Sequence, residues 1–186
     1  MKIGVLADTH IPELLPALPP SVLDVLRGVD IILHLGDVCE LNVLQQLEPI
    51  AQTYAVYGDS DNAQVRQYLQ EKQRLEFANR AVGLVHGHHA WEGGFGTRLS
   101  YRLNADKRAL ALYQAVLREF DDVDAIVFGH SHEPYIKMHG AVLLFNPGSI
   151  VPRKGRKGTM GFLEISQQDI KGRIVTIESV SARTSS

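Results

Sequence analysis

The sequence has little cysteine, no strong excess of charge of either sign and no long apolar run. Cys39 is the only cysteine among 186 residues, so no disulfide can form within the chain. The formal net charge of -2 gives no general attraction to nucleic acid or anionic membranes. No apolar run is long enough to span a membrane, and Met1–Val5 is not typical of a signal peptide. We therefore expect a cytoplasmic protein that binds neither membranes nor nucleic acid.

Histidine, in contrast, is frequent. The eight histidines gather in clusters, which is typical of metal binding. A chain of this length can bury a core and is most often one domain, so we expect a single domain over residues 1–186.

Short apolar runs alternate first with helical patterns and later with hairpins. The expected strands span residues 2–7, 30–35, 53–56, 75–78, 81–85, 124–128, 135–138, 142–145, 160–165 and 170–177. The first expected helix begins at Ser21, as a capping residue. The other expected helices span residues 41–47, 65–69 and 104–120. In the last of these, one face carries Leu110, Tyr113, Leu117 and Phe120. Hairpin turns are expected at Asn79-Arg80 and His139-Gly140. This order predicts an α/β fold, a four-layer α/β/β/α sandwich of two facing mixed sheets flanked by helices.

Candidate ligands follow five of these strands. The apolar run Ile126–Phe128 ends at a glycine, and His130 and His132 come next. Residues two apart lean the same way in an extended segment, and open α/β sheets bind ligands at this end of their strands. The earlier strand ends carry Asp8 with His10, Asp37, Asp59 and His86. Carboxylates with imidazoles suit Mn²⁺, Fe²⁺ or Zn²⁺, and two ions sharing a carboxylate would use the whole set.

The series of motifs resembles the calcineurin-like metallophosphoesterases. The motifs are Asp8-Thr9-His10, Gly36-Asp37, Gly58-Asp59-Ser60-Asp61, His86-Gly87-His88 and Gly129-His130-Ser131-His132. A later turn, Asn146-Pro147-Gly148-Ser149, resembles the small bacterial and archaeal phosphodiesterase branch, to which a retromer subunit of the same fold is related.

The resemblance implies a phosphodiesterase with two divalent ions, manganese first and iron, nickel or zinc as alternatives. Asp8, His10 and His132 would hold one ion, Asp59, His86 and His130 the other, and Asp37 would bridge. A hydroxide between the ions would attack a small-molecule phosphate ester in line with its leaving group. The residues expected to act in catalysis are His10, Asp37, Asp59 and His88. The alternatives are a phosphomonoesterase and a non-catalytic scaffold for a protein partner, although scaffold relatives have lost metal-binding histidines that this chain keeps.

Two positions depart from the family pattern. Asp59 stands where the family usually has asparagine. The aspartate adds negative charge beside the phosphate. Ser60 stands where some members have a histidine that protonates the leaving group. Either the leaving group is a good one, or a nearby group such as His88 donates the proton.

Several other side chains have alternative interpretations. Asp8 and Asp37 could instead be helix caps. Asp61 is expected to brace its loop, His34 to be structural and His139 to be solvated in a turn. Arg153, in a basic loop, could be solvated or could contact substrate together with His88. The aromatic side chains of Trp91, Phe95 and Tyr101 could form a wall for an aromatic leaving group or a contact in a homo-oligomer.

Overall fold

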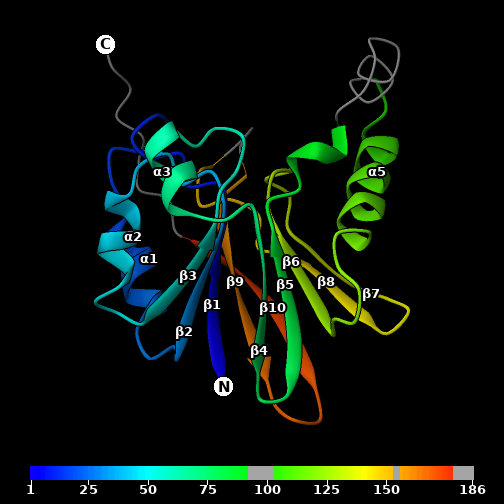
Figure 1. Ribbon diagram of the computed structural model, residues 1–186. Helices are drawn as coiled ribbons and strands as arrows, with labels where there is room; N and C mark the ends of the chain where they lie inside the picture. Colours follow the sequence, from blue (N-terminus) through cyan, green and yellow to red (C-terminus); the bar gives the residue numbers. More distant parts are fainter. Residues whose placement is uncertain (92–102, 153–155, 178–186) are drawn as a thin grey trace.

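Two mixed five-stranded sheets face each other, with helices on both outer sides (Figure 1). The computed structural model describes residues 1–91, 103–152 and 156–177. The strands are β1 (Lys2–Leu6), β2 (Ile31–Leu35), β3 (Gln52–Val56), β4 (Lys72–Phe77), β5 (Arg80–Val85), β6 (Ala125–Phe128), β7 (Tyr135–His139), β8 (Val142–Asn146), β9 (Gly158–Ile165) and β10 (Ile170–Ile177). The helices are α1 (Pro20–Leu26), α2 (Asn42–Leu47), α3 (Ala63–Tyr68), α5 (Ala105–Leu117) and the short 3₁₀ helix η1 (His88–Trp91). This is the predicted four-layer sandwich.

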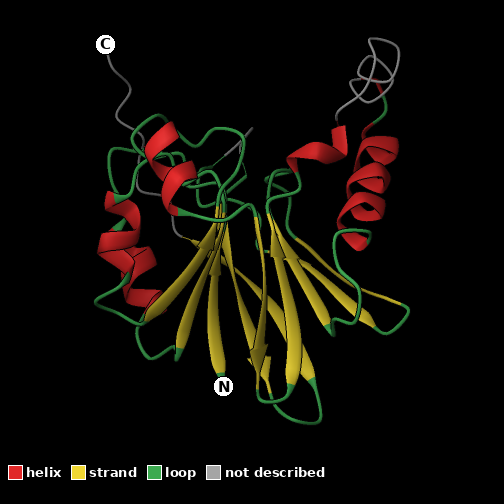
Figure 2. Ribbon diagram, viewed as in Figure 1, coloured by secondary structure: helices red, strands yellow, loops and turns green. Residues whose placement is uncertain are grey.

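The strands that carry the candidate ligands run parallel within each sheet. The first sheet has the order β10-β9-β1-β2-β3, in which β1, β2 and β3 are parallel. The second has the order β4-β5-β6-β8-β7, in which β5, β6 and β8 are parallel. Parallel strands end at a common edge, and both sheets direct this edge toward the same side of the molecule (Figure 2). Loops far apart in the sequence therefore meet there.

Alternation along the strands divides the buried side chains among three layers of core. In β6, Ala125 and Val127 point into the core between the sheets, whereas Ile126 and Phe128 pack on the opposite face. Leu112 and Val116 of α5 cover that outer face. Helices α1 and α2 cover the outer face of the first sheet in the same way. Burial on both faces explains why these strands are continuous apolar runs rather than alternating ones.

Two predicted positions were wrong, the start of the first helix and the turn between β4 and β5. Helix α1 begins at Pro20 after Pro19, and Ser21 makes no capping hydrogen bond, because proline already has helical φ and needs no amide partner at a first turn. The β4–β5 turn lies at Ala78 and Asn79, with φ of 50° and 62°, rather than at Asn79-Arg80. Arg80 already pairs with Phe77 in the ladder.

Two side-chain assignments were also wrong. Leu110 is 53% exposed, because the buried face of α5 is centred on Leu112 and Val116, one turn apart. His139 is not a solvated turn residue. It ends β7, is half-buried, and its Nε2 lies 2.8 Å from the Tyr135 hydroxyl. No described helix is both long and apolar enough to cross a lipid bilayer.

Candidate metal centre

The seven predicted ligands lie together where the two sheets meet. The loops after β1, β2 and β3 contribute every carboxylate, and the loops after β5 and β6 contribute three of the four histidines. The candidate ligands are Asp8, His10, Asp37, Asp59, His86, His130 and His132. They form two groups of side chains, divided as the metallophosphoesterase pattern implies.

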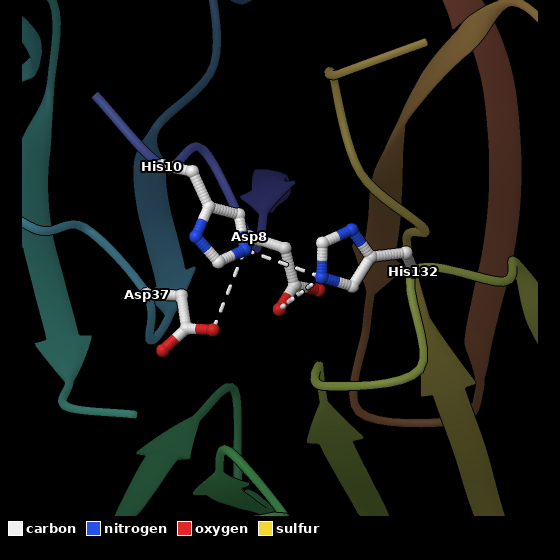
Figure 3. A group of neighbouring side chains, drawn as sticks. All are labelled: Asp8, His10, Asp37 and His132. Carbon is white, nitrogen blue, oxygen red and sulfur yellow. Dashed lines mark hydrogen bonds and ion pairs between the residues drawn. The ribbon is translucent and has the colours of Figure 1, made fainter. Parts of the chain in front are cut away.

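The first ligand group contains Asp8, His10, Asp37 and His132, with one candidate ligand atom of each within 4.8 Å of the others. Figure 3 shows their side chains pointing toward one another. His10 Nε2 lies 3.2 Å from His132 Nε2 and 3.4 Å from Asp37 Oδ2. His132 Nε2 lies 3.6 Å from Asp8 Oδ1. Two nitrogen and two oxygen donors thus surround one point.

The second ligand group contains Asp59, His86 and His130. Asp59 Oδ1 lies 3.1 Å from His86 Nε2 and 3.0 Å from His130 Nδ1. His86 is fully buried, and its Nδ1 lies 2.7 Å from the carbonyl oxygen of Leu35, which orients Nε2 toward the carboxylates. Burial lowers the pKa of His86, but Asp37, Asp59 and Asp8 outweigh it and hold the pKa well above its usual value. The carboxylates therefore favour a positive charge here.

Asp37 joins the two groups. Its Oδ2 lies 3.4 Å from His10 Nε2 in the first group and 3.5 Å from His86 Nε2 in the second. Ser60 donates to both carboxylate oxygens, from its backbone N–H at 2.8 Å and its hydroxyl at 3.1 Å. Burial raises the pKa of Asp37, but hydrogen bonds with His86 and Ser60 lower it well below the usual range. Asp37 is therefore an anion placed between the groups.

Asp8 supplies a direct test of whether the residues fit a cation. It is fully buried, and its Oδ1 accepts a hydrogen bond from the His130 backbone at 3.1 Å. Its Oδ2 is buried without a hydrogen-bond partner among the described residues. Burial raises the pKa of Asp8 to about 7, because the lost hydration of the anion outweighs the charge of His86 and the hydrogen bond from the His130 backbone. A bound cation would satisfy this oxygen, so the site fits divalent ions that accept oxygen and nitrogen ligands.

Five of the ligands have left-handed backbones. Asp8, His10, Asp37, His130 and His132 have φ between 46° and 67°. This conformation is uncommon outside glycine and costs about 1–2 kcal/mol per residue. The loops keep it because their amides are bonded to the neighbouring strand ends. For example, the His10 N–H donates to the Asp37 carbonyl at 3.0 Å.

Side chains outside the candidate ligand set hold these loops in place. The Asp61 carboxylate accepts from the backbone N–H groups of Asp37, Cys39 and Gly58 at 2.6–3.0 Å, so it braces the loops as predicted. Asn146 Nδ2 donates to the Gly129 carbonyl at 2.8 Å, and Ser149 donates to the Asp8 carbonyl at 2.7 Å. The turn containing these two residues therefore supports the loops of both sheets. The alternative that Asp8 and Asp37 cap helices fails, because no described helix begins beside either residue.

The predicted substrate contacts are only partly described. His88 lies beside the second group, with its ring centroid 5.7 Å from that of His86. Burial lowers its pKa to about 4, so the imidazole is neutral near pH 7. Arg153 and the aromatic residues Phe95 and Tyr101 lie outside the described residues, as does the side chain of Trp91.

A cavity of about 580 Å³ opens beside His132. Helix α5 contributes Arg108 and Tyr113 to its wall, and the basic loop contributes Arg156 and Lys157. Arg156 is paired with Glu133 on the same wall. The basic loop therefore borders the candidate metal centre through these two residues.

The sequence pattern did not predict one group of side chains near the candidate centre. Glu71 lies within reach of His88 and His89, although it precedes them by a full hairpin. A lone glutamate between α3 and β4 gives no signal of its own. Only the contact in space reveals it.

Similarity to known proteins decides the family. Residues 1–168 match the calcineurin-like phosphoesterase superfamily domain. The chain belongs to this superfamily. A probable metallophosphoesterase of Methanocaldococcus jannaschii is 33% identical over 180 residues, covering 96% of this chain and 82% of that protein. A protein of the same organism named as a phosphodiesterase is 24% identical over 185 residues, covering 92% of this metallophosphoesterase and 97% of the relative.

A solved structure supports the same assignment. Entamoeba histolytica Vps29 in complex with Zn²⁺ superposes with a TM-score of 0.69 and 27% identity, covering 95% of this chain and 99% of that one. The match extends over both sheets, which confirms the calcineurin-like fold.

Proposed function

We propose that this metallophosphoesterase is a phosphodiesterase that works with two divalent ions. The observation that carries the proposal is the position of Asp37, one of whose oxygens faces both ligand groups. A carboxylate shared in this way suits a pair of ions, whereas a single ion would leave half of the ligands unused. The relative named as a phosphodiesterase supports the choice of reaction.

Each ligand group has its own ion in this proposal. Asp8, His10 and His132 hold one, Asp59, His86 and His130 hold the other, and Asp37 contacts both. Manganese is the first choice, and iron, nickel and zinc accept the same ligands. When bound, such a pair supplies an activated water and positive charge for the phosphate oxygens.

The rest of the site prepares these ligands and receives the ester. Ser60 fixes the bridging carboxylate with two hydrogen bonds, and the Leu35 carbonyl fixes the ring of His86. The cavity beside His132 offers room for an organic group next to the phosphate, with Tyr113 as an apolar surface and Arg108 as a cation. A diester carries a second organic group, and this cavity supplies space for it.

The test is an assay of the metal-stripped protein reconstituted with Mn²⁺, Fe²⁺, Ni²⁺ or Zn²⁺. Bis-p-nitrophenyl phosphate and p-nitrophenyl phosphate are compared in parallel. We expect turnover of the diester and its near-complete loss in His132→Ala, together with loss of bound metal. His139→Ala, which alters a histidine outside both groups, serves as the control. Failure to hydrolyse either ester with any of these ions would overturn the proposal, and preference for the monoester would make the protein a phosphatase.

A scaffold function is the second candidate, favoured by the similarity to Vps29. A scaffold would bind a protein partner without chemistry. Full retention of the seven ligands argues for the enzyme, because partner binding does not need them. A partner that binds equally well to His132→Ala, together with no hydrolysis by the wild type, would favour the scaffold.

A further inference from the structure

A separate set of metal-type side chains lies at the edge of the proposed dinuclear centre. Glu71, His88 and His89 each place one candidate ligand atom within 4.8 Å of the others. His89 Nε2 lies 2.5 Å from Glu71 Oε1, and His88 Nε2 lies 3.9 Å from the same oxygen. None of the three residues is among the seven ligands of the centre.

The two histidines converge although they are adjacent in sequence. Neighbouring residues of a helix do not ordinarily face each other. Here, in η1, the ring centroids of His88 and His89 are 4.0 Å apart, and both Nε2 atoms are directed to one carboxylate oxygen. Tyr57 donates to the other oxygen of Glu71 at 3.2 Å, which turns Oε1 toward the imidazoles. The set is therefore oriented from both sides.

The space beside the three side chains also suits a ligand. A cavity of about 110 Å³ is lined by Glu71, His88 and His89, and also by Lys72 and Glu119, which pair with each other at 2.9 Å. The space is large enough for an ion with water molecules in its open coordination positions.

We propose that Glu71, His88 and His89 bind a third divalent ion of the borderline class, such as Zn²⁺. Two imidazoles and one carboxylate are a known zinc ligand set with positions left for water. The alternative is a simple ion pair between His89 and Glu71. That alternative does not explain why His88 also approaches the same oxygen.

The third ion would act on the neighbouring centre by its charge. His88 packs beside the second ligand group, with ring centroids 5.7 Å from His86 and 6.5 Å from His130. Asp59, in the second ligand group, carries a negative charge, whereas the asparagine usual in the family at this position is neutral. A cation beside it would offset this charge and favour the approach of a phosphate. This effect on the ester rests on the proposed function, whereas binding of the ion does not.

Metal counting tests the site without reference to activity. The protein is stripped with a chelator, dialysed to equilibrium against Zn²⁺, and its bound metal is counted by atomic emission. We expect one ion fewer in Glu71→Gln and in His89→Gln than in the wild type. Glu76→Gln, which removes the same charge from an exposed position of β4, should keep the wild-type count.

Asp8→Asn separates this site from the dinuclear centre. It should lose metal from the first ligand group and keep the ion that Glu71→Gln removes. A wild-type count that does not fall in either Glu71→Gln or His89→Gln would overturn the third site, whatever the esterase assay shows. Loss of esterase activity alone in these variants, with the count unchanged, would also overturn it.

Discussion

Asp59 is the one candidate ligand whose chemistry departs from the metallophosphoesterase pattern. Burial raises its pKa, but hydrogen bonds with His130 and His86 lower the pKa far more, so it is an anion at neutral pH. It is also the most exposed of the seven ligands, with 49% of its side chain accessible. An anion here strengthens the hold on a cation and repels an incoming phosphate.

Replacing Asp59 with asparagine should therefore trade metal affinity for phosphate affinity. We expect weaker metal binding by about tenfold in Asp59→Asn and a lower KM for the diester, because one negative charge is gone while an oxygen ligand remains. Metal titration and steady-state kinetics with saturating metal measure the two effects. Asp59→Ala, which removes the oxygen as well, should lose metal without improving KM. An unchanged KM in Asp59→Asn would contradict this account.

His34 is a buried base whose protonation is coupled to folding. It is fully buried, its Nε2 lies 3.1 Å from the Thr9 hydroxyl, and burial lowers its pKa to about 3. Between about pH 6.5 and pH 3, the unfolded chain binds a proton at this residue and the folded chain does not. The free energy of unfolding should therefore decrease as the pH is lowered through this window, by about 1.4 kcal/mol per pH unit from this residue.

The variant His34→Gln should lose this part of the acid sensitivity, because its amide can replace Nε2 beside Thr9 without titrating. Urea unfolding of chelator-treated protein, at about pH 7 and about pH 4, measures the difference. His139→Gln, at a half-buried histidine, should retain the acid sensitivity of the wild type. Equal acid sensitivity of His34→Gln and wild type would refute the argument.

At the scale of elements, the loops depend on Asp61 as much as on their own residues. Its carboxylate binds backbone amides of the loops after β2 and β3. Leaving such buried amides unpaired costs about 1–3 kcal/mol each. We expect Asp61→Ala to lower the free energy of unfolding by about 3 kcal/mol and to weaken metal binding at least tenfold, although Asp61 binds no metal.

Urea unfolding and metal titration of Asp61→Ala check both expectations. Asp24→Ala, at an exposed carboxylate of α1, is the control and should change stability by less than about 0.5 kcal/mol. A stable Asp61→Ala with normal metal affinity would show that the loops hold their shape without this brace.

Local patterns predicted the elements well where burial is complete. The runs that became β2, β5 and β6 are buried almost throughout, and each is followed by its predicted ligand. Prediction was poorer where local chemistry has equivalent solutions. Either proline or serine can begin α1, and the left-handed pair at the β4–β5 turn could be shifted by one residue. Neighbouring sequence does not distinguish these choices, because tertiary contacts decide them.

The pairing of distant segments was beyond local reasoning. The terminal hairpin joins the first sheet through β9, antiparallel to β1, although most of the chain separates them. Glu71 meets His88 and His89 only because β4 and β5 fold back on each other. The seven candidate ligands could be named because the family pattern orders them, and the structure brings them together. Metal binding by these residues and their assignment to two ions stay predictions, with the observed grouping in their support.

At the scale of the whole molecule, metal should stabilise the fold. Ligands that bind only the folded state raise its stability, by about 2.7 kcal/mol at a concentration 100 times the dissociation constant. For a chain of this size, we expect chelation to lower Tm by roughly 5–10 °C. Scanning calorimetry with and without EDTA measures the shift. His132→Ala should show a smaller shift than His139→Ala, and equal shifts in the two variants would contradict a role for the first ligand group.

The division of the ligands between the sheets also bears on the order of folding. Asp8, His10, Asp37 and Asp59 extend from the first sheet, while His86, His130 and His132 extend from the second. A chain with only the first sheet formed lacks three of the four imidazoles, and one with only the second lacks every carboxylate, so neither has a complete binding site. Tight capture of metal therefore has to wait until the sheets have docked. Metal binding would report the final assembly of the protein rather than guide its earlier steps.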